Sequence, residues 1–276
     1  MRADFVMFIL SFLACSASLP LVINMMERAG NTRLNYEGRQ IPTSLGLIFI
    51  LILVPAAFVA VEMGFMTLDD ALPPLFLLCA VGMAGLLDDL LGQGDMKAKG
   101  FKGHLGALLF EGRLSTGALK AIFTGFSALL LAMIIERTLA GVVLSALIIA
   151  LATNLINLLD LRPGRAAKAY LAVVILLSLA WGARCFDGPL FYLVPLTGAV
   201  LAYIRTDLRA RGMMGDTGSN ILGGALGYGL AAGTEGAVRA GVLVILLLIQ
   251  AYAERWSISR AIENNRLLRF LDNLGR

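Results

Sequence analysis

The chain has 276 residues, of which 58% are hydrophobic and only 15% are charged. Soluble domains are about half apolar and a quarter charged, so this composition excludes an ordinary soluble protein and favours a membrane protein. The net charge of +4 does not indicate nucleic-acid binding, because the cations lie beside apolar segments, where membrane topology and anionic headgroups explain them. Three irregularly spaced cysteines predict neither a disulfide framework nor a zinc site.

Apolar blocks long enough to cross a bilayer as helices, about 20 residues each, recur along the whole chain. The first block is long enough to span, which favours a retained helix over a cleaved signal peptide. Glycine, alanine and serine are scattered through the blocks, as close helix packing in lipid favours. The predicted spans are residues 4–26, 44–62, 71–91, 117–135, 139–159, 167–184, 189–204, 219–234 and 237–253.

The predicted fold class is therefore all-α: a polytopic transmembrane helical bundle of about nine spans (residues 1–253), followed by an amphipathic tail (residues 254–276). Apolar residues and arginines alternate in the tail. A helix lying on the inner leaflet and a helix docked over the cytoplasmic loops both fit this pattern.

The 23 lysines and arginines divide unevenly between the two sides of such a bundle. Positive charge marks the cytoplasmic side, which places the N-terminus outside, the tail inside and the protein in the inner or plasma membrane. The side with few cations holds Arg2, Arg137, Arg184 and Arg239, and the other 19 lie on the side of loops 27–43, 92–116, 160–166 and 205–218 and the tail.

Asp88 and Asp89 end the third predicted span. A carboxylate costs about 2.5–3.5 kcal/mol at mid-membrane and less near the interface, and the C-terminus of a helix disfavours anions. The pair therefore needs a counter-cation, either a metal or the cluster of Lys97, Lys99 and Lys102. The alternative is a solvated helix end.

Asn154, Asn157 and Asp160 close the fifth predicted span. Their three-residue spacing places them on one side of an otherwise apolar helix, which then faces the bundle interior or a wet cavity. The alternative is structural hydrogen bonding between helices.

Residues 214–220, Met-Gly-Asp-Thr-Gly-Ser-Asn, open the eighth predicted span. Free amides at a helix N-terminus suit phosphate, and an aspartate among them can bind a divalent metal that bridges phosphate oxygens. The alternative is ordinary N-capping by Asp216, Thr217 or Ser219. All three motifs share the predicted cytoplasmic boundary, which together favours Mg²⁺-assisted handling of a phosphorylated substrate.

In this order the three motifs resemble those of the polyprenyl-phosphate N-acetylhexosamine-1-phosphate transferase family. Asp88-Asp89 matches its Asp-Asp motif, Asn154, Asn157 and Asp160 match the first part of its Asn-x-x-Asn-x-x-Asp-Gly-x-Asp-Gly loop, and residues 214–219 match its Gly-Asp-x-Gly-Ser motif. Residues 38–46 look like the family's Pro-Thr-x-Gly-Gly segment before the second span.

The resemblance implies Mg²⁺-dependent transfer of a sugar-1-phosphate from a UDP-sugar to polyprenyl (undecaprenyl) phosphate, with release of UMP, in cell-envelope glycan synthesis. It also makes a homodimer unsurprising. The residue roles that it implies are metal binding by Asp216, catalysis by Asp88, Asp89 and Asp216, lipid-phosphate binding by Lys97 and Lys99, and nucleotide or diphosphate binding by Asn154, Asn157, Asp160, Gly215 and Ser219.

Two departures from the family pattern lie on the donor side. Pro163 replaces the second aspartate of the nucleotide loop, and Asn264-Asn265 lie where a His-x-His-His cluster is expected, while the only histidine, His104, lies in another loop. The sequence therefore predicts a divergent member with an altered donor. Two alternatives are a catalytically degenerate relative that binds polyprenyl phosphate as a regulator or scaffold, and a transporter. Transport is disfavoured because the acids cluster at one interface rather than at mid-depth.

Overall fold

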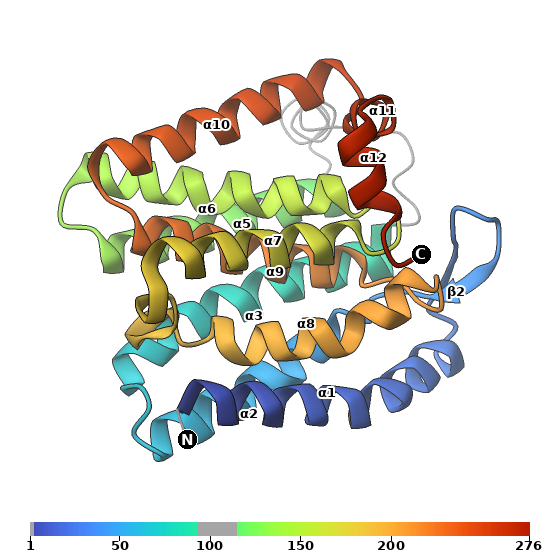
Figure 1. Cartoon of the computed structure of the whole chain (residues 1–276), viewed down its shortest axis with the longest axis horizontal. Helices are drawn as coiled ribbons and strands as arrows, with labels where there is room; N and C mark the ends of the chain where they lie inside the picture. The colour runs from blue at the N-terminus through green and yellow to red at the C-terminus, as the bar shows by residue number, and fades with distance from the viewer. Residues whose placement is uncertain (1–2, 93–114) are drawn as a thin grey trace.

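A computed structural model describes residues 3–92 and 115–276 of the chain (Figure 1). The elements in chain order are α1 (Ala3–Arg28), β1 (Thr32–Leu34), β2 (Gln40–Pro42), α2 (Leu47–Glu62), α3 (Leu68–Leu91), α5 (Thr116–Ile135), α6 (Leu139–Leu159), α7 (Arg165–Trp181), the 3₁₀ turns η2 (Gly182–Phe186) and η3 (Gly188–Leu190), α8 (Leu193–Leu208), α9 (Gly215–Gly233), α10 (Gly236–Arg255), α11 (Ile258–Asn264) and α12 (Arg266–Asn273).

The long helices form the bundle that the sequence predicts, and each predicted span overlaps one of them. The all-α fold class is confirmed, and the chain is a multi-pass membrane protein. Within the described residues, six helical segments are long and apolar enough to cross a membrane: Asp4–Arg28, Leu68–Leu91, Thr116–Ile135, Leu139–Leu159, Gly188–Leu208 and Gly236–Arg255. The count of nine spans and their orientation stay predictions.

The centre of the bundle is α9, which is buried along nearly its whole length and packs between α3 and α6. Glycines on α9 make the contact with α6 close, because a Cβ at Gly223 would lie 2.5 Å from the Cα of Thr153, and one at Gly227 would lie 2.6 Å from the Cα of Ile149. Small residues serve this purpose at helix interfaces in lipid. In contrast, α10 buries only Leu246.

The connection between α1 and α2 is a β-hairpin that the sequence analysis missed. Its strands are antiparallel, with Arg33 opposite Ile41, and each has three residues, too few to show the alternation that identifies a strand. The Asn35 side chain accepts hydrogen bonds from the backbone nitrogens of Glu37 and Arg39, both at 2.9 Å, and so fixes the turn.

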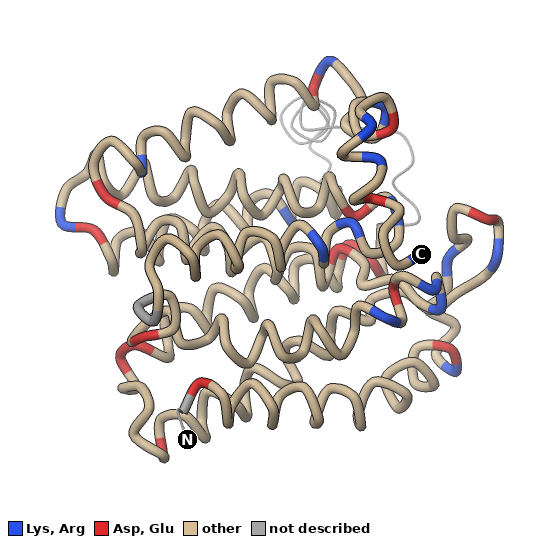
Figure 2. Tube along the Cα trace, in the orientation of Figure 1, with Lys and Arg blue, Asp and Glu red and all other residues tan. Residues whose placement is uncertain are grey.

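The tail forms two short helices, α11 and α12, rather than one continuous amphipathic helix. Asn265 separates them: its side chain caps α12 by accepting from the backbone nitrogens of Leu267 (3.0 Å) and Leu268 (3.1 Å). In Figure 1, α12 lies beside the start of α7. Figure 2 shows that lysines and arginines are concentrated at this end of the bundle, which also carries the hairpin.

Candidate active site where α3, α5, α6 and α9 meet

The carboxylate of Asp89, at the end of α3, lies against the first turn of α9. It accepts hydrogen bonds from the backbone nitrogens of Asp216 (3.0 Å) and Thr217 (3.1 Å) and from the Thr217 hydroxyl (2.7 Å). The first amides of a helix have no partner within it and form its positive end, so they stabilise a buried carboxylate. Asp89, which is 3% exposed, thus obtains from α9 the compensation that the sequence analysis sought from a metal or a lysine.

Two glycines make this approach of α3 and α9 sterically feasible. A Cβ at Gly85 would lie 2.3 Å from the carbonyl oxygen of Asp216, a distance at which the two backbones would have to separate. Gly215 has φ +70°, and a Cβ there would lie 2.4 Å from Oδ2 of Asp89. Glycine adopts this left-handed conformation without steric cost. The Gly215-Asp216 motif therefore has a structural reason besides the predicted binding of phosphate.

Lys120 of α5 joins the acids of two other helices. Its Nζ lies 2.9 Å from Oδ2 of Asp88 and also contacts Oδ2 of Asp216. All three side chains are less than one-third exposed, so water screens these ion pairs less than it would at an open surface. The sequence gives Lys120 no role beyond that of one of the 19 cations on the predicted cytoplasmic side, because its spacing from the acids carries no local signal.

Asn157 of α6 completes the group, which we call the carboxylate cluster (Asp88, Asp89, Lys120, Asn157 and Asp216). With its amide orientation assigned from its neighbours, Asn157 donates to Oδ1 of Asp216 (2.9 Å) and to Ser219 Oγ (3.0 Å), and its oxygen accepts from Lys120 Nζ (3.1 Å). The cluster thus brings side chains from four helices to one end of the bundle.

The donor set of the cluster fits a hard divalent cation. Oδ2 of Asp88 and Oδ2 of Asp216 converge on one positive charge, that of Lys120, with the amide oxygen of Asn157 beside them. Within the described residues, no group of three or more His, Cys, Asp or Glu side chains could hold a metal ion by itself. Mg²⁺ is commonly held by one or two carboxylates together with substrate phosphates and water, which is the set that Asp88 and Asp216 could supply.

A cavity of about 170 Å³ opens beside the cluster, between the hairpin and the connection from α6 to α7. Burial raises the pKa of Asp160 at its wall, and the carboxylates of Asp207, Asp216 and Asp89 raise it further. The cavity is lined by Arg33, Asn35, Tyr36, Ile41, Thr43, Asp89, Asp160, Leu161, Arg162, Pro163, Asp207, Ala210, Gly212, Met213, Gly215 and Asp216.

The hairpin brings polar groups to this cavity that the sequence analysis did not identify. Arg33 donates from Nη2 to the carbonyl oxygen of Asp89 (2.6 Å), while its Nε and the Nδ2 of Asn35 are buried without a hydrogen-bond partner in the described part of the chain. The guanidinium of Arg162 lies 5.4 Å from the centre of the Tyr36 ring. Unpaired buried donors are costly, so they mark a place where a ligand can supply acceptors.

The structure brings most of the predicted site residues together, but not all. Asp88, Asp89, Asn157, Asp216 and Ser219 are within one network, and Asp160 and Gly215 line the adjacent cavity. The side chain of Asn154 is exposed on α6 and is not among the residues that line the cavity. Lys97 and Lys99, together with His104, lie outside the described residues.

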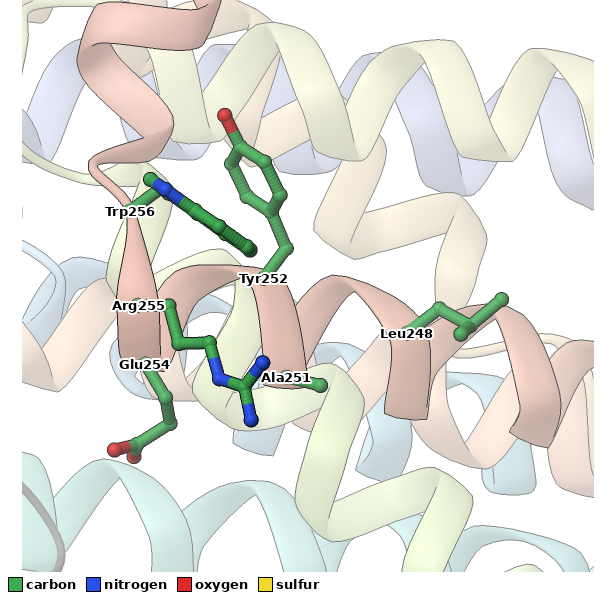
Figure 3. A pocket seen from close by; sticks show the side chains of 6 residues that line it. All are labelled: Leu248, Ala251, Tyr252, Glu254, Arg255 and Trp256. Carbon is green, nitrogen blue, oxygen red and sulfur yellow. The ribbon is translucent and has the colours of Figure 1, made fainter.

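Larger cavities lie elsewhere, and the acids of the carboxylate cluster do not line them. One of about 530 Å³ lies where α10 meets α11 (Figure 3) and is lined by Leu248, Ala251, Tyr252, Glu254, Arg255 and Trp256. Another of about 480 Å³ lies at the opposite end of the bundle, next to an ion pair between Glu136 and Arg239. The chemistry of the side chains, rather than cavity size, identifies the candidate active site.

Comparisons with known proteins identify the family of the chain. Residues 72–234, which include the whole carboxylate cluster, match the family model described as glycosyl transferase family 4. The chain is 31% identical over 232 residues to the phospho-N-acetylmuramoyl-pentapeptide-transferase of Clostridium perfringens (strain SM101 / Type A), which covers 79% of this chain and 70% of that protein. The protein of the same name from Clostridium kluyveri (strain NBRC 12016) is 29% identical over 216 residues, covering 74% of this chain and 65% of that protein.

Proposed function

Because this chain belongs to glycosyl transferase family 4, whose members transfer a phospho-sugar to polyprenyl phosphate, we propose that it moves a sugar-1-phosphate from a nucleotide sugar to undecaprenyl phosphate. The chain is a phosphoglycosyl transferase. We further propose that the donor is a UDP-sugar, that the reaction needs Mg²⁺, and that the product enters cell-envelope glycan synthesis.

One observation carries the proposal: carboxylates from two helices, those of Asp88 and Asp216, converge on one cation beside a cavity lined by polar side chains. In the reaction, an oxygen of the lipid phosphate forms a bond to the phosphorus that bears the sugar. The bond from that phosphorus to the nucleoside monophosphate breaks, and the nucleotide leaves. Mg²⁺ would be held by Asp216 and Asp88 and would neutralise negative charge on the donor diphosphate.

The two neighbouring acids of α3 receive different roles in this proposal. Asp88 contacts Lys120 and is open enough to meet the lipid phosphate, which it would position or deprotonate. Asp89 is held by the amides of α9 and would position Asp216 from behind. Lys120 would hold the cluster together before substrate arrives and then stabilise charge on the transferred phosphoryl group.

On this proposal the donor diphosphate would lie between the cluster and the cavity. Asn157, Ser219 and Gly215 lie where they could contact it, and Asp160 faces the same space. Lys97 and Lys99 remain the predicted lipid-phosphate ligands and Asn154 a predicted nucleotide ligand, on the strength of the resemblance alone.

The uneven distribution of cations supports a cytoplasmic active site in the cell membrane, with the N-terminus outside. The bundle of residues 1–253 would then carry the reaction, and residues 254–276 would lie on the cytoplasmic side. Labelling of single cysteines placed in the 136–138 and 209–212 connections, in intact cells, tests this orientation. Labelling of the second site but not the first by an impermeant reagent would contradict it.

The direct test supplies the purified protein with undecaprenyl phosphate, Mg²⁺ and a panel of nucleotide sugars, and measures the release of nucleoside monophosphate. We expect release with at least one donor and none without the lipid. Absence of release from every donor, with binding of the lipid phosphate retained, would instead favour a degenerate member that acts as a regulator or scaffold.

A further inference from the structure

The connection between α6 and α7 together with the first residue of α7, which we call the loop wall (residues 160–165), lines the cavity through residues 160–163 but has little internal support. Its backbone hydrogen bonds are confined to near neighbours, such as that from Leu161 to Leu159 (2.8 Å). Beyond these near neighbours, and within residues 3–92 and 115–253, the bundle gives the loop wall one hydrogen bond, in which the Gly164 nitrogen donates to the carboxylate of Asp207 (2.9 Å). A segment of this kind needs outside contacts to keep a single conformation.

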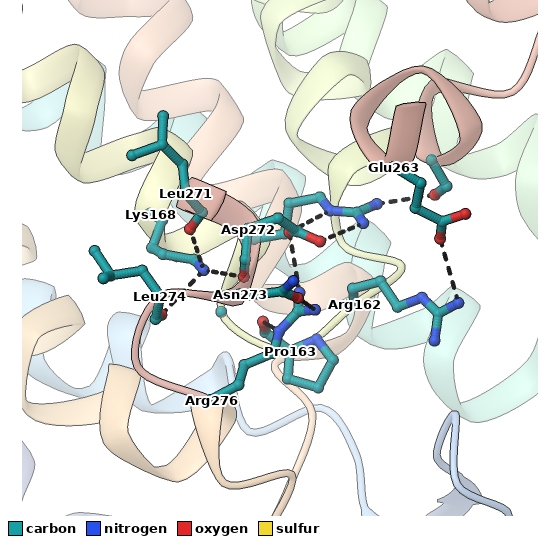
Figure 4. Close-up of polar contacts among 12 residues, drawn as sticks. Arg162, Pro163, Lys168, Glu263, Leu271, Asp272, Asn273, Leu274 and Arg276 are labelled. Atoms are coloured by element: carbon teal, nitrogen blue, oxygen red, sulfur yellow. Dashed lines mark hydrogen bonds and ion pairs between the residues drawn. The ribbon is translucent and has the colours of Figure 1, made fainter. Parts of the chain in front are cut away.

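The tail supplies these contacts (Figure 4). At the end of the loop wall, Arg165 donates from Nε and Nη2 to the two carboxylate oxygens of Asp272, at 2.8 and 2.9 Å, and from Nη1 to the hydroxyl of Ser259 (2.8 Å). A bidentate pair of this kind fixes both the distance and the relative orientation of the guanidinium and the carboxylate. Arg165 is 5% exposed and Asp272 9%, so water screens the pair little.

Other contacts from the tail surround this pair. Nε of Arg276 donates to the carbonyl oxygen of Pro163 (3.0 Å), and its Nη2 donates to Asp272 (3.0 Å). Lys168 of α7 donates to the carbonyl oxygens of Leu271 and Leu274 and so caps the end of α12. The loop wall is thus fastened to the tail at both Pro163 and Arg165.

We propose that the Arg165–Asp272 ion pair positions the binding site for the nucleotide-sugar donor. Through this pair, the tail holds the loop wall in the conformation in which the cavity binds the donor. The inference rests on the proposed function in assuming that the donor enters this cavity. The tail would then act at the point where Pro163 replaces an acid of the family pattern, because Arg276 donates a hydrogen bond to the carbonyl oxygen of Pro163.

The test compares Asp272→Ala with wild type and with two controls. Asp272→Glu keeps the charge, and Arg269→Ala removes a tail arginine whose side chain has no polar partner in the described part of the chain. In hydrogen exchange, we expect amides 160–168 to exchange faster in Asp272→Ala, with amides 215–220 unchanged. In kinetics, we expect kcat/KM for the donor to fall about tenfold or more, because small displacements of a binding wall are amplified in rate.

Comparing the kinetic constants for the two substrates distinguishes a role in positioning the donor from a general loss of structure. The KM for undecaprenyl phosphate should stay within about twofold of wild type, Asp272→Glu should recover most of the donor effect, and Arg269→Ala should behave as wild type. Equal losses for both substrates, or unchanged exchange at residues 160–168, would overturn the proposal.

If the wild-type protein turns over no donor, the proposed function fails, whereas the exchange comparison still decides whether Asp272 positions the loop wall. If Asp272→Ala does not fold, Arg276→Ala, which removes the contact with Pro163, is measured in the same way.

Discussion

The carboxylate cluster and the loop wall both contribute residues to one cavity but are built differently. The cluster stands on helix ends, where backbone amides and close glycine contacts hold Asp89 and Asp216 in place. The loop wall is irregular backbone that distant residues of the tail hold through side chains. The close backbone contacts of the carboxylate cluster tolerate few substitutions. The loop wall can vary without disturbing the bundle. We therefore expect substitutions in the loop wall to be tolerated better than substitutions in the carboxylate cluster.

Removing the charge of Asp216 is expected to have the largest effect of any change in the cluster. Asp216→Asn should lower turnover at least about a hundredfold, since it removes the central electrostatic group of the site. Nucleotide release in detergent measures this effect. Asp69→Asn, an exposed acid at the start of α3, is the control and should leave turnover unchanged. Normal turnover in Asp216→Asn would refute its assignment as a metal ligand.

Loss of charge at the neighbouring acids Asp88 and Asp89 should have different effects, on turnover at Asp88 and on stability at Asp89. Asp89→Asn places an amide group against the donors of α9 and should destabilise the protein by about 3 kcal/mol. Asp88→Asn leaves Lys120 its partner Asp216, and should reduce turnover with little change in thermal unfolding. Equal loss of stability in both variants would show that the two carboxylates are not divided in role as proposed.

Gly85→Ala tests whether the cluster depends on the close approach of α3 and α9. The new methyl group would collide with the Asp216 backbone and should cost about 1–3 kcal/mol, lowering the melting temperature and turnover together. The matched control is Gly125→Ala, also inside a helix but with nothing within 4 Å of the new Cβ. It should be neutral or slightly stabilising. A stable, active Gly85→Ala would mean that the two helices can separate freely.

The smallest expected effect is that of pH on the contact between the tail and the loop wall. Burial alone would raise the pKa of Asp272, but its bond with Arg165 and the charges of Arg165, Arg276 and Lys168 lower it below the usual 3.8. A lowered pKa means that the contribution of this carboxylate to docking is complete above pH 3.8 and is lost as the pH falls through the lowered value.

Hydrogen exchange of residues 266–274, corrected for the intrinsic effect of pH, measures this loss. The tail should be protected at neutral pH and should lose protection only in strong acid, and Asp272→Asn should lack this transition. Protection that is identical in wild type at neutral pH and in strong acid would show that the ion pair does not hold the tail.

The parts of the molecule that could be predicted from sequence are those in which the signal is local. The long helices follow from apolar blocks, and the cluster acids follow from charges placed beside those blocks. The hairpin could not be predicted because its three-residue strands are too short to show a pattern. Lys120 could not be assigned to the site because its partners are 32 and 96 residues away in the chain. Asn154 shows the limit of the spacing argument, since it shares a helical side with Asn157 and yet is exposed.

The bond between Arg165 and Asp272 joins positions 107 residues apart, and this separation has a consequence for biosynthesis. When the ribosome has made the acids of the cluster, the loop wall still lacks its anchor. The donor side of the site would then be completed last, after α11 and α12 have emerged and docked. If the proposed function is correct, a nascent chain that is already inserted in the membrane would bind the lipid phosphate before it could bind a nucleotide sugar.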